Sequence, residues 1–123
     1  MKFNLSLSAF LGFLAIVLGA FGAHALKEKL DIEAIQSYET GVRYMMYHVL
    51  VLLFINTYTG FNHKVKNWIS YLFFTGILFF SGSIFAITAG GISAKYIWFI
   101  TPLGGLLFIL GWLYMFFTFL KKN

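Results

Sequence analysis

The residue in this sequence best suited to chemistry is His48, which lies inside an apolar run over residues 44–61. An ionisable side chain is costly inside lipid and usually faces protein or water there. Tyr44 precedes His48 by one helical turn, and Leu52 and Asn56 continue the same stripe. Because histidine titrates near physiological pH, His48 is a candidate proton or ligand group. A neutral imidazole that hydrogen-bonds a neighbouring helix fits the same pattern without any chemistry.

The wider candidate polar cluster consists of His24, Glu39, Arg43, Tyr44 and His48. Two histidines and a carboxylate can bind a metal, but the spacing from His24 to His48 matches no local metal motif. We therefore expect no metal site and no cofactor. An enzyme acting on lipid headgroups would need these same side chains to converge. The sequence has no recognisable Ser-His-Asp set and no phosphate-binding glycine loop, so we expect no catalytic residues and no enzymatic activity.

Four apolar runs must position these residues. They cover about residues 3–22, 44–61, 68–90 and 96–120. Each is near the ~20 residues that a helix needs to cross a hydrocarbon core of ~30 Å. Residues 50–55 lack the alternating polarity of a barrel strand, so the backbone must satisfy its hydrogen bonds within helices. We predict a single all-α domain over residues 1–123, an integral membrane four-helix bundle.

The first apolar run is followed by Ala23-His24-Ala25, which is similar to the cleavage site of a signal peptide. The run is longer than the core of about 7–15 residues that signal peptides usually have. We therefore expect it to remain in the protein as the first span.

The composition supports lipid as the solvent of this 123-residue chain. Hydrophobic residues make up 60% and charged residues 11%, against about 45–50% and about 25% in soluble domains. Such a composition excludes a soluble enzyme domain, a disordered chain and a nucleic-acid-binding module, and makes the lipid bilayer the expected partner. The absence of cysteine removes disulfides and thiolate metal sites.

The segment between the first two runs has the pattern of a short amphipathic helix. Its apolar residues recur at helical spacing and are Leu30, Ala34, Ile35, Tyr38 and Val42. Asp31 can cap the helix, and Glu39 and Arg43 form an i,i+4 pair. We predict a helix lying at the membrane interface that bends near Gly41 into the second span. A solvated helix without a functional role is the alternative.

The charges give a weak orientation signal. In a four-span chain, one side holds Lys2, Lys64, Lys66, Lys121 and Lys122, and the other holds Lys27, Lys29, Arg43 and Lys95. All four acidic residues lie in the first loop. Basic residues favour the cytoplasmic side, so we predict a bacterial plasma-membrane protein with both termini in the cytoplasm.

Small residues mark the faces on which these helices are expected to pack. The glycines expected to make these contacts are Gly12, Gly19, Gly22, Gly82, Gly104, Gly105 and Gly111. In lipid, helices associate where small residues let backbones approach closely. The pattern predicts tight packing and does not say whether the contacts lie within one bundle, between copies in a homo-oligomer, or with another membrane protein.

Several motifs in chain order resemble a known family. They are Gly19-Ala20-Phe21-Gly22-Ala23-His24-Ala25-Leu26, Tyr44-Met45-Met46-Tyr47-His48, Phe79-Phe80-Ser81-Gly82-Ser83, Thr101-Pro102-Leu103-Gly104-Gly105 and Gly111-Trp112. This set resembles the uncharacterised-function family 423, which includes eukaryotic transmembrane protein 256. The resemblance implies a four-helix integral membrane protein without an established reaction. Its polar positions correspond here to His24, Tyr44, Tyr47, His48, Ser81, Ser83 and Thr101.

These observations favour a small multi-pass membrane protein with a non-enzymatic role, either as an accessory to a partner complex or in membrane integrity. The alternative is a small transporter or channel that uses His48 as a proton or ligand group. Coupled pumps usually place acidic or arginine side chains in mid-membrane, and the predicted spans contain none.

Overall fold

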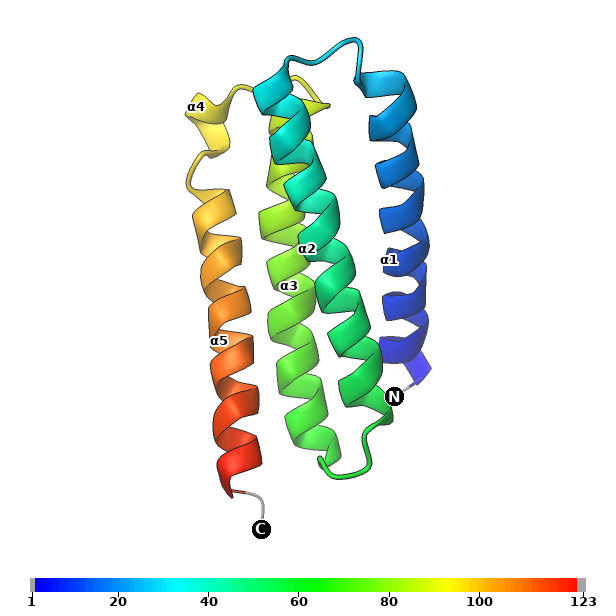
Figure 1. Cartoon of the computed structure of the whole chain (residues 1–123). Coiled ribbons are helices and arrows are strands. Elements are labelled where there is room, and N and C mark those ends of the chain that lie inside the picture. Colours follow the sequence, from blue (N-terminus) through cyan, green and yellow to red (C-terminus); the bar gives the residue numbers. More distant parts are fainter. Residues whose placement is uncertain (1, 122–123) are drawn as a thin grey trace.

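A computed structural model describes residues 2–121, and these residues form helices and connecting loops without a strand. The elements are α1 (Lys2–Phe21), the π-helical turn η1 (Gly22–Leu26), α2 (Ile32–Thr57), α3 (His63–Thr88), α4 (Ala94–Ile97) and α5 (Ile100–Lys121). Four long helices run antiparallel to their chain neighbours, and the N- and C-terminal ends lie at the same end of the bundle (Figure 1). The predicted all-α class is confirmed.

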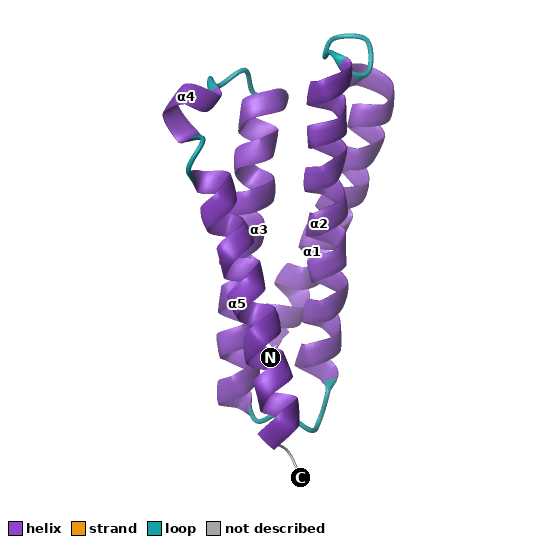
Figure 2. Cartoon of the chain, turned by 60° about the vertical axis from the view of Figure 1, so that its left-hand side comes forward, coloured by secondary structure: helices purple, strands orange, loops and turns teal. Residues whose placement is uncertain are grey.

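The helices pack in chain order, with α1 on α2, α2 on α3 and α3 on α5. Figure 2 shows the α1/α2 pair beside the α3/α5 pair. The buried core lies mainly between α2 and α3 and includes Met45, Val49, Leu52, Ile69, Phe73 and Ile77. The two central helices therefore carry most of the packing, and α1 and α5 flank them.

The segment predicted as a separate interfacial helix is the first part of α2, which continues without a break to Thr57. Asp31 caps this helix, because its carboxylate accepts from the Ala34 N–H at 2.8 Å. The expected bend at Gly41 is absent. A glycine inside a helix costs about 1 kcal/mol relative to alanine. Here the Ser81 Oγ of α3 donates to the Gly41 carbonyl at 2.7 Å, and this bond holds α2 against α3 at that point.

The last long helix begins later than the predicted residue 96, because the link before it is longer than expected. The chain turns at Gly91, whose positive φ of 71° favours glycine, and Ser93 caps the four-residue helix α4. The long helix α5 then begins at Ile100. Pro102 lies in its first turn, where a missing N–H is tolerated.

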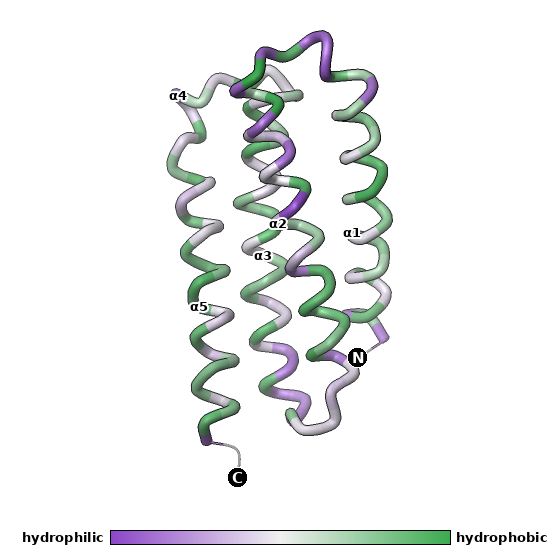
Figure 3. Tube along the Cα trace, in the orientation of Figure 1, coloured by the Kyte–Doolittle hydropathy of each residue, from purple (hydrophilic) through white to green (hydrophobic). Residues whose placement is uncertain are grey.

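Three helical segments within residues 2–121 are long and apolar enough to cross a membrane: Lys2–Leu26, His63–Thr88 and Ile100–Lys121. The helix α2 is not among them, and its first half carries Glu33, Glu39 and Arg43. Hydrophilic residues gather in that half of α2, in the loop before it and at the start of α3 (Figure 3). Large apolar side chains face outward along the bundle, as expected for helices surrounded by lipid.

Candidate functional site

His48 lies at the centre of the packed helices, with 3% of its surface exposed. Its Nδ1 is 2.7 Å from the Tyr44 carbonyl oxygen, and the indole Nε1 of Trp112 on α5 donates to its Nε2 at 3.0 Å. A carbonyl can only accept and an indole N–H can only donate. The imidazole is therefore the neutral Nδ1–H tautomer, and both of its nitrogens are occupied.

Aromatic rings enclose the imidazole. The Phe108 ring stacks on it with centroids 3.7 Å apart and an interplanar angle of 7°, and the Phe73 ring meets it edge-on at 5.0 Å. A cavity of about 490 Å³ opens beside this group and is lined by residues of α2, α3 and α5, including Tyr44, Phe80 and Trp112. The site offers an apolar recess without a free basic nitrogen.

The structure divides the predicted polar cluster. The Tyr38 hydroxyl donates to the Leu18 carbonyl, so Tyr38 lies level with the end of α1. His48 is ten residues further along α2, which is about 15 Å of helical rise. His24 lies in η1 beyond that end of α1, so His24 and His48 are far apart.

The remaining cluster members do not form the expected pair. Arg43 Nη2 donates to Thr40 Oγ1 at 3.0 Å, and Glu39 is exposed. Among the described residues there is no group of three His, Cys, Asp or Glu side chains that could hold a metal ion. Only Tyr44 and His48 come together, with ring centroids 6.3 Å apart.

A second polar site joins three helices near the N-terminal end of α1. Asn4 Nδ2 donates to Asn56 Oδ1 and to Asn67 Oδ1, both at 3.0 Å. Asn56 in turn donates to Ser70 Oγ at 2.9 Å. Of these four residues, the sequence singled out only Asn56, which continues the helical stripe of His48. A usable signal was present, because asparagines next to apolar runs need partners once they leave water.

The other polar positions from the family resemblance also have local partners. The Ser83 and Thr101 hydroxyls hydrogen-bond each other between α3 and α5. Tyr47 is half exposed and its ring contacts that of Tyr44 at 5.5 Å. These groups connect or cover helices, and they do not converge on His48.

Most of the predicted packing glycines lie at helix contacts. A Cβ on Gly104 would lie 2.2 Å from the Phe80 backbone nitrogen, and one on Gly111 would lie 2.4 Å from the Phe73 ring. Gly12 and Gly19 of α1 and Gly22 of η1 lie against Val49, Val42 and Tyr38 of α2. These contacts fall within one chain.

Gly82 and Gly105 differ from this prediction. A Cβ on Gly82 would meet only Leu78 of its own helix, at 4.0 Å, and one on Gly105 would be 3.8 Å from Phe80. The reason is the rotation of α3, which turns Gly76 and Phe80 toward α5 and Ser81 toward α2. Gly82 is left lining an open groove.

Comparison with known proteins agrees with a membrane location. The profile of a family described as a protein of unknown function (DUF423) matches residues 18–105. A UPF0382 membrane protein of Staphylococcus saprophyticus is 42% identical over 113 residues, or 92% of each chain. The UPF0382 membrane protein YwdK of Bacillus subtilis is 39% identical over 118 residues, again 92% of each. No solved structure gives a significant match. The chain therefore belongs to the DUF423 family of uncharacterised membrane proteins.

Proposed function

We propose that this protein has a non-enzymatic, accessory role in the bacterial plasma membrane. The observation that carries the proposal is the state of His48, whose two ring nitrogens are both used in hydrogen bonds: Nδ1 bonds the Tyr44 carbonyl of its own helix, and Nε2 accepts from Trp112 and so ties α2 to α5. A general base or proton carrier needs a free nitrogen near its substrate. Here the imidazole acts as a structural bridge.

We also propose that α2 is a fourth membrane crossing. Support comes from the directions of its neighbours, since α1 and α3 both begin at the end of the bundle where the termini lie (Figure 1). If α1 and α3 cross the bilayer in the same direction, the chain must return between them, and α2 is the segment that does so.

The charges support an orientation with both termini in the cytoplasm. Four basic residues within the described chain lie at the terminal end: Lys2, Lys64, Lys66 and Lys121. Lys122 extends this set in the sequence but lies outside the described residues. The opposite end also carries four basic residues, together with all four acidic residues. The count is 5 to 4 in favour of the terminal side.

The alternative, transport through His48, has less support. Proton transfer through this residue would require the Trp112–His48 hydrogen bond to break, because a protonated imidazole cannot accept from the indole N–H. The neighbouring cavity contains an imidazole and a phenol among apolar side chains. An accessory role does not require the Trp112–His48 hydrogen bond to break.

Vesicle flux measurements test the proposal. Wild-type protein, His48→Leu and Trp112→Phe would be reconstituted with an enclosed pH-sensitive dye. We expect all three to match protein-free vesicles. Proton flux through the wild type that His48→Leu abolishes would overturn the proposal.

A cellular measurement tests the positive part of the same proposal. Cells lacking the protein are expected to take up more of a normally excluded dye or to lose a membrane complex, and the wild type should restore them. Trp112→Phe should restore them less, because it leaves His48 Nε2 without its donor and destabilises the bundle by about 1 kcal/mol. Trp98→Phe, at an exposed ring in the α4–α5 link, is the matched control. Unchanged cells after deletion would contradict an accessory role.

A further inference from the structure

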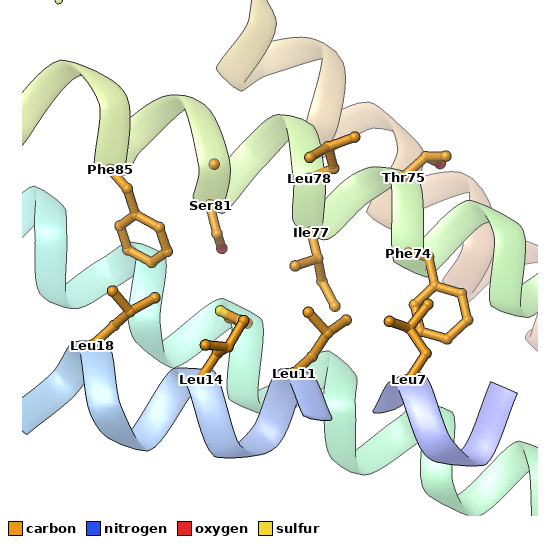
Figure 4. A pocket seen from close by; sticks show the side chains of 12 residues that line it. Leu7, Leu11, Leu14, Leu18, Phe74, Thr75, Ile77, Leu78, Ser81 and Phe85 are labelled. Carbon is orange, nitrogen blue, oxygen red and sulfur yellow. The ribbon is translucent and has the colours of Figure 1, made fainter. Parts of the chain in front are cut away.

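An apolar groove lies between α1 and α3, on the side of the bundle away from α5. Leu7, Leu11, Leu14 and Leu18 form one wall, facing Phe74, Ile77, Ser81 and Phe85 across the gap (Figure 4). Two hydroxyls line the groove, and both donate to backbone carbonyls at 2.7 Å: Ser81 to Gly41 and Thr75 to Tyr71. An occupant therefore meets an apolar surface.

The length and the apolar lining of the groove suit a hydrocarbon chain. The volume of the groove is about 430 Å³, and the rise from Leu7 to Leu18 is about 17 Å. An extended hydrocarbon chain makes carbon contacts at about 4 Å, and along this length it would meet the apolar side chains of α1 and α3.

The charges at one end of the groove favour a particular headgroup. The Asn4–Asn67 hydrogen bond joins α1 to α3 just below the groove. Lys2 stands two residues before Asn4, and Lys64 three residues before Asn67, both exposed. All four acidic residues lie in residues 28–39 at the other end of the molecule. Lysines at a membrane surface attract anionic headgroups.

We propose that this protein binds an anionic phospholipid, with one acyl chain in the groove between α1 and α3 and the phosphate at Lys2 and Lys64. Leu7 is five residues from Lys2, about 8 Å along the helix, so the chain reaches the groove soon after leaving the headgroup region. The proposed site is separate from His48 and does not depend on the accessory role.

Native mass spectrometry of the full-length protein in detergent tests this site. Protein would be incubated with phosphatidylglycerol or phosphatidylcholine carrying identical acyl chains. We expect retention of one phosphatidylglycerol, favoured on the order of tenfold over phosphatidylcholine by the two lysines. Equal retention of the two lipids would overturn the headgroup assignment.

Two sets of variants locate the site. Gly82→Leu should fill the groove, because Gly82 lines it and a Cβ there would meet nothing closer than 4.0 Å, and it should abolish retention. Gly105→Leu adds the same bulk to the cavity beside His48 and should retain lipid. Lys2→Gln with Lys64→Gln should remove the preference for phosphatidylglycerol, and Lys95→Gln at the opposite end should keep it.

Thermal denaturation of each variant shows whether it is folded, so that a loss of lipid binding can be distinguished from unfolding. If Gly82→Leu does not fold, Leu14→Phe narrows the groove from α1 and is expected to reduce retention likewise. Undiminished phosphatidylglycerol binding by a folded groove variant would overturn the proposal. A wild-type dimer that Gly82→Leu converts to a monomer, without any lipid effect, would instead assign the groove to a second copy.

Discussion

At the scale of single residues, the molecule uses its few polar groups as connections between helices. His48 joins α2 to α5 through Trp112, and Ser81 joins α3 to α2 through the Gly41 carbonyl. Within residues 2–121, no fully buried side-chain nitrogen or oxygen lacks a hydrogen-bond partner. In a low-dielectric interior an unpaired polar group is expensive, so these bonds preserve the packing as well as adding to it.

The close approach of α5 to α3 at Gly104 predicts opposite effects for substitutions at two adjacent glycines. Gly104→Ala would place a methyl 2.2 Å from the Phe80 backbone nitrogen, and no rotamer change can relieve a backbone clash. We expect a loss of about 3 kcal/mol in the free energy of unfolding, measured by thermal denaturation in detergent. Gly105→Ala meets only an ordinary contact at 3.8 Å and should be neutral or stabilising, because alanine favours helix. Similar melting temperatures for the two variants would contradict this account.

At the scale of elements, α1 is the least embedded long helix. It packs chiefly on α2, through a face that includes the buried Ser8 and Ala15, and its polar tie to α3 is the bond from Asn4 to Asn67. The groove occupies the rest of the space between α1 and α3. The position of α1 relative to α3 therefore depends on a small polar junction at one end.

Removal of that junction should loosen α1 selectively. Asn4→Leu keeps the side-chain size but leaves the Oδ1 atoms of Asn56 and Asn67 without this donor. We expect a loss of about 1 kcal/mol, the usual size of interhelical hydrogen bonds in membranes. Amide exchange should quicken over residues 2–21 and remain slow in α5. Ser6→Leu, at an exposed position two residues away, should leave exchange unchanged; a uniform increase across the chain would refute a local role for Asn4.

At the scale of the whole molecule, charge is distributed unevenly between the two ends. Among the described residues, the terminal end carries Lys2, Lys64, Lys66 and Lys121 without an acidic residue, whereas the other end has both signs. This asymmetry bears on the orientation in the membrane and on attraction to anionic lipid. The proposed cytoplasmic orientation and the proposed lipid site both depend on the basic residues at the terminal end of the bundle.

Orientation and the fourth crossing can be tested together, because the natural chain has no cysteine. Single cysteines would replace Glu28, Thr59 and Ser93, which lie in or beside the three connections and are exposed. A membrane-impermeant maleimide added to intact cells should label Glu28→Cys and Ser93→Cys but not Thr59→Cys until the cells are opened. Labelling of Glu28→Cys and Thr59→Cys from the same side would show that α2 does not cross.

The sequence by itself determined the all-α class, the lipid environment and many packing positions, because composition and 3.6-residue periodicity are properties of each helix alone. It also singled out His48, which the structure buries among α2, α3 and α5. Only the tertiary structure decided that Trp112 is its partner, that Asn4, Asn56 and Asn67 meet, and that Gly82 lines a groove. These features depend on how neighbouring helices are rotated and aligned. That arrangement is fixed by side chains distant in sequence, such as Phe73 against Gly111, which no local pattern encodes.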